Sequence, residues 1–308
     1  LAPLPGTDGA LACAVMHVLL AEGYADRDYL AKYSDFSPAV EAHFMQRSPE
    51  WAASITGLTP TQIVEFARLY GSTKRSYLRI GYGFTRQRNG SAAMHAVSCL
   101  PAMTGAWAHP GGGALYGQSG LYGPKRTFLN GEDVPNPSAR TLDMSRLGAV
   151  LAGAPRDLGD GPPVSVLLVQ NTNPAVVAPE SGRVREGLLR EDLFTCVHEH
   201  FLTDTAKLAD LVLPATMFLE HDDLYQASGH TFLQAARALI PAPGECRSNQ
   251  VFIGQLAARL GLAHPAFALD AWSLVDRVLK DSGQTSADDL LAAGWLDFAP
   301  PFEKAHFL

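Results

Sequence analysis

The sequence has few cysteines and no closely spaced ones, which limits the metal centres and bridges that it can build. The four cysteines, Cys13, Cys99, Cys196 and Cys246, lie far apart among 308 residues. No CxxC pair occurs, so neither a zinc ribbon nor an iron–sulfur site is expected within this chain. The expected state of each cysteine is a buried thiol, because cysteine is among the residue types most often buried.

Long apolar runs and an excess of positive charge are also missing. No apolar run reaches the roughly 18 residues that a membrane-spanning helix needs, so no such helix is expected. Lys and Arg number 24 against 31 Asp and Glu, for a net charge of −7, and no basic stripe occurs, so nucleic acid is not an expected partner. The chain starts at Leu1 with neither a Met nor a charged segment ahead of an apolar one. We therefore expect no signal peptide, and a fragment or a processed chain.

What the sequence does contain is typical of a folded α/β protein. Hydrophobic residues make up 47% and charged residues 18%, an ordinary globular balance, and the length suggests about two domains. Apolar spacing predicts helices over residues 9–22, 25–31, 38–46, 60–70 and 91–104, and a short strand over 77–80. Thr7 or Asp8 is expected to cap the first helix with its side chain, and Thr59 the fourth.

The second half of the chain has a regular alternation. Apolar runs at 164–169, 194–197 and 211–213 predict buried strands, and helices are expected between them at 180–190 and 203–209. Later helices are expected at 249–260 and 271–279. Continuous apolar runs that alternate with helices predict a parallel sheet covered on both faces, as in doubly wound α/β folds. Gly111-Gly112-Gly113 and the glycine- and proline-rich stretch 117–137 predict a long irregular region.

Polar residues gather where each of these three strands ends. The first strand is followed by Asn171-Thr172-Asn173-Pro174, the second by His198-Glu199-His200, and the third by Glu220-His221-Asp222-Asp223. Open α/β sheets bind ligands beyond the carboxyl ends of their parallel strands. The three loops therefore predict one wall of a large ligand site.

The residue types in these loops leave several chemistries open. The amides and the hydroxyl of 171–173 suit a phosphate, a ribose or an amide-bearing ring, or else a simple turn before Pro174. Glu199 suits paired N–H or O–H donors, as on guanine or ribose. A metal-dependent hydrolase built on His198, His200, His221 and Asp222 is an alternative, although no HExxH helix occurs.

No motif supplies a nucleophile or a phosphate loop. Gly81, Gly83 and Gly90 flank Arg86 and Arg88, so that backbone can approach a ligand while guanidinium groups bind phosphate. The segment matches neither a Walker loop nor a GxGxxG fingerprint, and no GxSxG elbow occurs. The sequence thus has the features of a cradle for a large polar cofactor, with the reacting atoms supplied elsewhere.

A series of segments, in order, resembles the molybdopterin oxidoreductases of the dimethyl sulfoxide reductase superfamily, formate dehydrogenases and nitrate reductases among them. The matching stretches are PGTDGALA (5–12), GYGFTRQRNG (81–90), LPAMTGAWAHPGGG (100–113), LLVQNTNPA (167–175), FTCVHEHFLTDTAKLADLVLPATMFLEHDD (194–223) and PGECRSN (243–249). The resemblance implies a bis(molybdopterin guanine dinucleotide) cofactor with molybdenum or tungsten, which exchanges two electrons with a small-molecule substrate.

The resemblance also implies roles for individual residues. It places Tyr82 and Arg86 near the pterin or the metal, and Thr172 and Asn173 on one dinucleotide. His198 and Glu199 stand where the family often has a Ser-Asp or Gln-Asp pair that holds guanosine; Glu199 keeps the carboxylate, whereas His198 departs from the pattern.

Two later positions depart from some nitrate reductases. His221 stands where those enzymes have a lysine near phosphate, and Asn249 where they have an aspartate. With these two, the cofactor-binding prediction comprises Tyr82, Arg86, Thr172, Asn173, His198, Glu199, His221 and Asn249.

The resemblance further implies a larger parent protein. Residues 1–75 are expected to be the C-terminal part of one α/β cofactor-binding domain, and 76–308 the larger part of a second. A 4Fe-4S cluster and the residue that ligates the metal are expected in a preceding segment. Partners are then the rest of the parent chain and an electron-transfer subunit. A non-catalytic scaffold subunit of the same superfamily is the remaining alternative.

Overall fold

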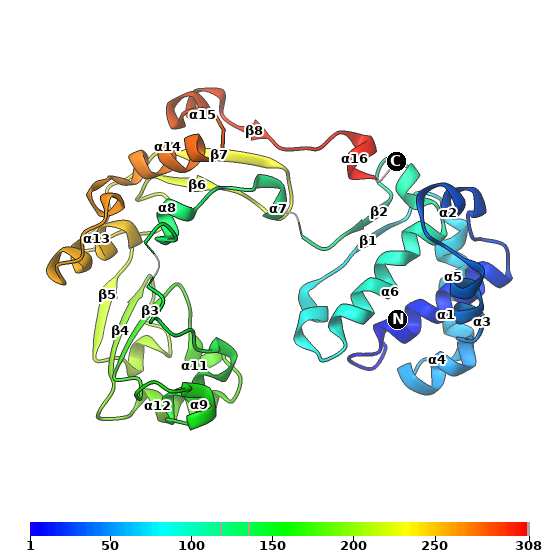
Figure 1. Ribbon diagram of the computed structural model, residues 1–308, viewed down its shortest axis with the longest axis horizontal. Coiled ribbons are helices and arrows are strands. Elements are labelled where there is room, and N and C mark those ends of the chain that lie inside the picture. Colours follow the sequence, from blue (N-terminus) through cyan, green and yellow to red (C-terminus); the bar gives the residue numbers. More distant parts are fainter. Residues whose placement is uncertain (118, 135, 307–308) are drawn as a thin grey trace. The chain divides into compact units, whose positions relative to one another are not determined.

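The computed structural model describes residues 1–117, 119–134 and 136–306 (Figure 1). The chain forms two compact units. The first comprises Leu1–Leu121, Ser228–Thr231 and the described part of Phe298–Leu308, and the second comprises Tyr122–Ala227 and Phe232–Asp297. The predicted boundary near residue 75 concerns domains of the parent protein and stays a prediction.

The first unit is mainly helical. Its helices are α1 (Asp8–Ala21), α2 (Arg27–Tyr33), α3 (Pro38–Met45), α4 (Pro49–Thr56), α5 (Pro60–Ser72), α6 (Gly90–Met103) and α16 (Phe302–Ala305), with 3₁₀ turns η1 (Tyr82–Arg86) and η2 (Ala106–Ala108). Helix α1 is the centre of the core, where Met16 and Leu19 are fully buried in one cluster with Tyr70 of α5 and Leu100 of α6. The parallel strands β1 (Tyr77–Arg79) and β2 (Gly113–Leu115) complete the unit.

Most of the predicted helices of this unit are confirmed, with local differences. Thr59 caps α5 in a capping box with Gln62, as its sequence signature predicts. The predicted side-chain cap of α1 is wrong, because the Thr7 hydroxyl donates to the backbone oxygen of Leu4 instead. Helix α4 and strand β2 were not predicted. Short helices and three-residue strands carry too little periodic pattern to be recognised.

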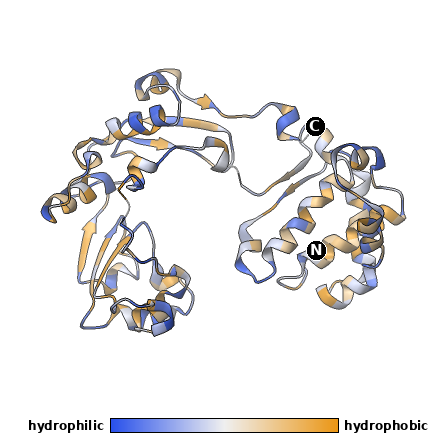
Figure 2. Ribbon diagram, in the orientation of Figure 1, coloured by the Kyte–Doolittle hydropathy of each residue, from blue (hydrophilic) through white to orange (hydrophobic). Residues whose placement is uncertain are grey.

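The second unit is built on a three-stranded parallel sheet in the order β3-β4-β5. Its strands are β3 (Val166–Gln170), β4 (Phe194–Glu199) and β5 (Leu211–Pro214), and Figure 2 shows them as largely apolar. In register, Gln170 lies opposite His198, and Glu199 lies opposite Pro214. The predicted parallel α/β arrangement is therefore confirmed, and the polar ends of neighbouring strands meet at one edge of the sheet.

Helices cover one face of this sheet. Buried side chains of α9 (Leu147–Leu151), α11 (Pro174–Val177) and α12 (Ser181–Leu188) form one core cluster, and Val169 and Val197 pack with Ala206 in another. On the other face Val166 and Phe194, near the amino ends of their strands, are 65% and 48% exposed, whereas His198 of β4 is buried against Phe252 of α13 (Asn249–Arg259). The predicted covering of both faces is therefore confirmed in part among the described residues.

The rest of the unit consists of an antiparallel sheet, further helices and 3₁₀ turns. An antiparallel sheet has the order β6-β7-β8, with β6 (Asp223–Tyr225), β7 (Phe232–Ala236) and β8 (Leu296–Asp297). The remaining helices are α8 (Thr127–Asn130), α10 (Pro155–Leu158), α13 (Asn249–Arg259), α14 (Ala271–Asp281) and α15 (Ala287–Ala293), with α7 (Ser119–Tyr122) at the junction of the units. The 3₁₀ turns are η3 (Met144–Arg146), η4 (Ala206–Leu208) and η5 (Pro265–Ala268), so the helix predicted at 203–209 is a single turn.

No helix in the described ranges combines the length and the apolar character that crossing a membrane requires.

Candidate functional site

The chain turns sharply at the end of β3. Asn171 directly follows the strand and has a φ of 56°, in the left-handed region that asparagine tolerates better than most residues. The segment that follows β5 continues along residues 247–248: Ala215 forms a parallel bridge with Arg247, and Ser248 then caps α13. The first residue of α13, Asn249, is thereby brought to the same edge of the sheet as the ends of the strands.

The buried side chain of His198 in β4 contacts residues of these neighbouring segments. Its side chain is 1% exposed, its Nε2 lies 3.1 Å from the Arg247 backbone oxygen, and its Nδ1 lies 3.1 Å from Asn249 Oδ1. Gln170 of β3 places its amide nitrogen 3.3 Å from both His198 Nδ1 and Asn249 Oδ1. The Phe252 ring covers the imidazole, with ring centroids 4.7 Å apart. His198 therefore ties β3, β4 and the start of α13 together.

A second chain of contacts begins at Glu199. Its Oε1 accepts from the backbone N–H of His200 at 2.7 Å, and His200 Nε2 lies 2.8 Å from the Thr216 backbone oxygen. The Thr216 hydroxyl lies 2.8 Å from His221 Nδ1, and His221 Nε2 lies 3.7 Å from an Asp223 carboxylate oxygen. These contacts orient both histidines along the rim of the strand ends.

The strand ends border one cavity of about 710 Å³. Its polar lining comes from the loop after β3, the segment after β5, β6 and the start of α13, and includes Asn171, His200, Thr216, His221, Asp222, Asp223, Ser248 and Asn249. Apolar side chains of α14, Leu274, Val275 and Val278, also line it. Such a mixture of apolar walls and a few converging polar groups is typical of ligand sites.

Tyr225 adds a protonated phenol to this cavity. Burial, followed by the nearby Asp223 carboxylate, raises the pKa of Tyr225, and its hydroxyl donates to the Phe218 backbone oxygen at 3.0 Å. Of the four cysteines expected to be buried, Cys196 of β4 is buried and Cys13, Cys99 and Cys246 are partly buried. Burial raises the pKa of the Cys196 thiol. A thiol held in the protonated form is a poor nucleophile.

The eight residues predicted to bind cofactor divide into groups. His221 and Asn249 line the cavity, while His198 and Glu199 hold neighbouring lining residues in place. Thr172 is exposed in the loop after β3, and Asn173 points its Oδ1 at Thr205 in the loop after β4. Asn171, named with its loop as a candidate, lines the cavity, whereas the lining residues Thr216 and Ser248 were missed, although each lies within five residues of a predicted position.

Tyr82 and Arg86 belong to the first unit, where both are exposed at the ends of η1. The Tyr82 ring meets that of Tyr116 edge-on at 5.0 Å, and Arg86 Nη1 donates to the Thr85 hydroxyl at 2.9 Å. Behind the turn, a Cβ at Gly90 would lie 1.5 Å from the Phe84 backbone oxygen. Glycine is therefore required there for the turn to close onto α6.

The four residues of the alternative metal site do not form a ligand set. Within residues 1–117, 119–134 and 136–306, no group of three or more His, Cys, Asp or Glu side chains is arranged to hold a metal ion. His198 and His200 are engaged with backbone oxygens, and Asp222 pairs with Arg237 at 3.2 Å while accepting from the Ala238 N–H. A hydrolase built on these residues is therefore not favoured.

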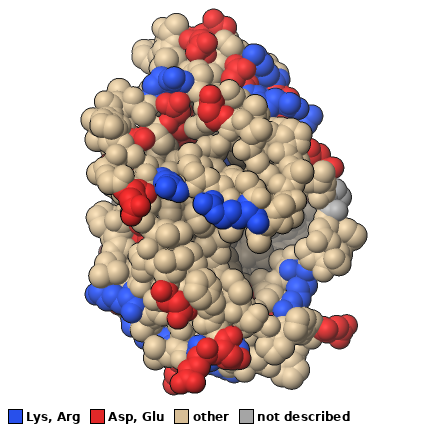
Figure 3. Space-filling view, turned by 90° about the vertical axis from the view of Figure 1, so that its left-hand side faces the viewer, with Lys and Arg blue, Asp and Glu red and all other residues tan. Residues whose placement is uncertain are grey.

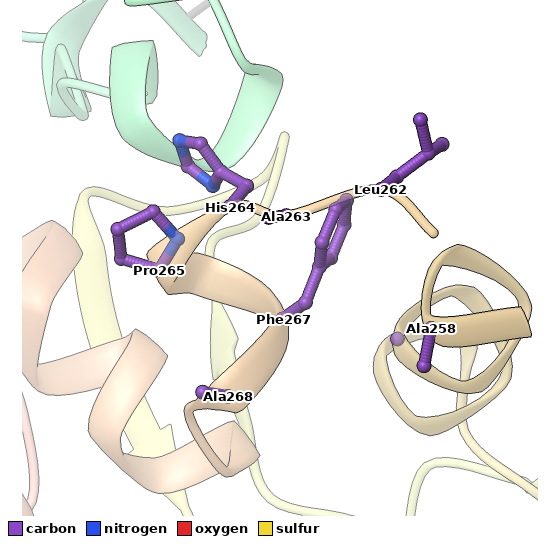
Figure 4. A pocket seen from close by; sticks show the side chains of 8 residues that line it. Ala258, Leu262, Ala263, His264, Pro265, Phe267 and Ala268 are labelled. Atoms are coloured by element: carbon purple, nitrogen blue, oxygen red, sulfur yellow. The ribbon is translucent and has the colours of Figure 1, made fainter. Parts of the chain in front are cut away.

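A second, more open hollow lies between α13 and η5 (Figure 4). It is lined by Gly254, Ala258, Leu262, Ala263, His264, Pro265, Phe267 and Ala268. His264 is already paired with Asp133 at 3.2 Å and caps Ala266. With its described lining otherwise apolar, this hollow lacks the converging polar groups of the larger cavity.

The face drawn in Figure 3 shows acidic and basic side chains interspersed among uncharged ones.

Comparisons with known proteins agree with the resemblance seen in the sequence. The family model for molybdopterin oxidoreductases matches residues 1–259. The chain is 40% identical over 281 residues to the probable oxidoreductase YoaE of Bacillus subtilis, covering 91% of this chain and 39% of that protein. It is 27% identical to the F420-dependent formate dehydrogenase subunit alpha of Methanocaldococcus jannaschii and 29% identical to the dimethyl sulfoxide/trimethylamine N-oxide reductase of Rhodobacter capsulatus. In both cases 84% of this chain is covered, with 40% and 35% of the relatives.

The fold is also similar to that of a solved structure. Acetylene hydratase from Pelobacter acetylenicus superimposes over 96% of this chain and 45% of its own length, with a TM-score of 0.70 and 19% identity. The chain thus spans less than half the length of each of these relatives. On the match of the family model to most of its length, the chain belongs to the molybdopterin oxidoreductase family.

Proposed function

We propose that this chain forms one wall of the bis(molybdopterin guanine dinucleotide) site of a molybdenum or tungsten oxidoreductase, and that its cavity holds a guanosine end of the cofactor. One observation carries the proposal. A single cavity of about 710 Å³ gathers Asn171, His221 and Asn249 from three segments at the carboxyl ends of the parallel strands, the place where open α/β sheets bind nucleotides.

The lining residues fit a nucleobase and a ribose better than a diphosphate. Asn171 and Asn249 offer amide donors and acceptors, and Asp222 and Asp223 offer carboxylates that accept from hydroxyl and ring N–H groups. Arg126 is the one cationic side chain among the described lining residues. The two phosphates are therefore expected to bind to basic groups outside this cavity. Arg86 stays a proposed cofactor-binding residue, near the pterin or the metal.

The bound cofactor would supply the two-electron exchange with a small-molecule substrate. The residues of this chain bind and orient the cofactor. Asn249 and His221 contact the guanosine, while His198 holds Asn249 in place and Glu199 holds His200 in place. The residue that ligates the metal and a 4Fe-4S cluster are proposed to lie in another part of the parent protein, with an electron-transfer subunit as a further partner. The 308-residue chain alone is accordingly expected to show no oxidoreductase turnover.

Titration of the chain with guanosine monophosphate (GMP) tests the cavity directly. Asn249→Ala should weaken GMP binding about tenfold, because a hydrogen bond to a ligand contributes roughly 1–1.5 kcal/mol. The matched control is Asn130→Ala, whose exposed side chain contacts Glu132 outside the cavity lining, and it should bind GMP like the unchanged chain. Equal binding by both variants would reject the cavity as the guanosine site.

Extraction of cofactor from the full-length parent tests the wider proposal. We expect a pterin that carries guanosine monophosphate, together with molybdenum or tungsten. A parent protein that yields neither pterin nor metal after expression in a cofactor-producing host would instead support a non-catalytic scaffold.

A further inference from the structure

The parallel sheet of the second unit leaves the amino half of one face exposed. We infer that this half is an interface for an amphipathic helix of the parent polypeptide, from a segment outside the 308 residues of this chain. Four large apolar side chains are exposed there: Val166 and Leu168 of β3, Phe194 of β4 and Leu211 of β5. The proposed interface depends on the larger parent protein of the proposed function, and on neither the cavity nor its ligand.

The register of the strands places these side chains on one face. Residues that lie opposite each other in parallel strands direct their side chains to the same side of the sheet. Val166 lies opposite Phe194, and Leu168 lies opposite Cys196, which in turn lies opposite Leu211. The exposed side chains therefore lie around Cys196 of the central strand, which is itself buried. We call these five residues the bare half-face.

The connections between the three strands lie on the other face. The segment from β3 to β4 contributes α12 to a core cluster with Leu167, and the segment from β4 to β5 contributes Ala206 to a cluster with Val169. Leu167 and Val169 alternate with the exposed residues of β3, so they belong to the opposite face. Crossovers of one hand between strands that follow in one direction all fall on one face. The chain between β3 and β5 therefore does not cover the bare half-face.

The carboxyl half of the same face already carries a helix. His198 follows Cys196 by two residues and so shares its face, and the Phe252 ring of α13 covers the imidazole with centroids 4.7 Å apart. The amino half continues this face with apolar side chains, but no described element buries them. Sheets made only of parallel strands occur almost entirely with both faces covered. A second helix beside α13 would complete the layer.

The size of the bare half-face fits one helix. Three strands about 4.8 Å apart span roughly 10 Å, which is about the diameter of a helix with its side chains. Along β3 the stretch Val166–Leu168 is roughly 10 Å long, a length that about two helical turns cover. The partner helix is therefore expected to direct apolar residues at i, i+3 or i+4, and i+7 to the sheet, with polar residues on its outer side.

The parent polypeptide, and not a second copy of this chain, is the expected source of the helix. The chain spans 39% of YoaE and 45% of acetylene hydratase, so more than half of each of these proteins lies outside the matched part. Helices that cover a parallel sheet usually belong to the crossover connections of the same polypeptide. A second copy would pack sheet against sheet, an arrangement typical of antiparallel sandwiches.

Maleimide labelling of the full-length parent tests whether the bare half-face is covered. Val166 and Leu189 are both 65% exposed in this chain, but Leu189 ends α12 in the helix layer of the other face. Val166→Cys should react with N-ethylmaleimide at least about tenfold more slowly in the folded parent than in urea, because reaction requires local opening. The matched control Leu189→Cys should show little such protection. Peptide mass spectrometry follows each site separately from the native cysteines, and an unprotected Val166→Cys would overturn the interface.

Photo-crosslinking identifies the partner without relying on a cysteine. With p-benzoylphenylalanine in place of Phe194, irradiation of the parent should join this position to a segment outside the 308 residues whose apolar residues have helical spacing. The product should keep the mass of one polypeptide on a denaturing gel. A product of twice that mass would assign the face to a second copy, and cross-links that end within the 308 residues would assign it to another part of this chain. Either result overturns the proposed interface.

The outcome is separable from that of the guanosine proposal. A parent that yields a guanosine-bearing pterin but leaves Val166→Cys unprotected would overturn the interface and leave the cofactor proposal intact. Protection and an intramolecular cross-link in a parent that yields no pterin would support the interface alone.

Discussion

Asn173 is bound to Thr205 across two neighbouring strand ends: its Oδ1 accepts from the Thr205 hydroxyl at 2.7 Å and from the Thr205 backbone N–H at 3.2 Å. The same hydroxyl accepts from the Ala175 N–H at the start of α11, at 3.0 Å. The loop after β3 and the loop after β4 are thus joined by one asparagine. Its oxygen is occupied within the protein, so any contact of Asn173 with a dinucleotide, which stays a proposal, must come from its amino group.

Replacing Thr205 by valine should destabilise the second unit. Thr205 is fully buried, and the isosteric change would leave the Ala175 N–H and the Asn173 oxygen without this partner. Unsatisfied buried polar groups cost roughly 1–3 kcal/mol, so the free energy of unfolding should fall by about that amount. Urea unfolding followed by circular dichroism measures it. Thr205→Ser keeps the hydroxyl and should lose clearly less; equal losses in both variants would mean that the methyl group, and not the network, matters.

Gly187 of α12 should tolerate no side chain, in contrast to another glycine of the same helix. A Cβ at Gly187 would lie 2.5 Å from the Leu151 Cβ, whereas a Cβ at Gly182 meets no atom within 4 Å. Gly187→Ala is therefore expected to destabilise the unit by roughly 1–3 kcal/mol through overpacking. Gly182→Ala should be neutral or stabilising by up to about 1 kcal/mol, because alanine favours the helix. Thermal unfolding of the two variants under the same conditions gives the comparison, and a loss of equal size in both would contradict close contact of α9 and α12.

The capping box of α5 should be measurable in the first unit. The Thr59 hydroxyl accepts from the Gln62 N–H at 3.2 Å, and the Gln62 side chain accepts from the Thr59 N–H at 2.9 Å. Thr59→Ala should lower the free energy of unfolding by about 1 kcal/mol, within the usual range of roughly 0.5–2 kcal/mol. Thr61→Ala, at an exposed position of the same helix, should change it little. A comparable loss at Thr61 would show that the effect does not come from the capping hydroxyl of Thr59, because alanine has the higher helix propensity.

The sequence was a good guide wherever a local pattern sufficed. Thr59 and Pro60 marked the start of α5, and the apolar runs near Val169 and Val197 marked parallel strands, because capping and burial depend on neighbouring residues. The resemblance also named His221 and Asn249, which line the cavity.

Other features depend on contacts between distant residues. The lining by Thr216 arises because Arg247, 31 positions later, lies beside the segment after β5. His198 shares a buried network with Asn249, 51 residues away. Strand β8 has two residues and pairs with β7 across a long separation, with Phe232 opposite Asp297. No spacing within a single sequence encodes such pairs, which is why the role of His198 as a buried connector was not foreseen.

A pH-dependent contribution to stability is expected from Arg146 and Asp157. The two groups pair at 2.9 Å, and the hydrogen bond from Arg146 lowers the pKa of the Asp157 carboxyl in the folded chain. A lowered pKa in the folded state means that the unfolded chain binds the proton more readily. The stabilisation is therefore fully present above the unfolded pKa of about 3.9, and it is lost as the pH falls through the lower folded value.

Asp157→Asn removes this contribution and should give the test. The unchanged chain is expected to be more stable than the variant at neutral pH by an amount that stays constant down to about pH 5 and then shrinks as the carboxyl is protonated. Urea unfolding across pH 2.5–7 would follow the difference. In an Arg146→Gln background the same substitution should have little pH-dependent effect, because the partner that lowers the pKa is gone. A difference that persists unchanged at the lowest pH, or that is the same in both backgrounds, would show that Asp157 contributes by some route other than its ion pair with Arg146.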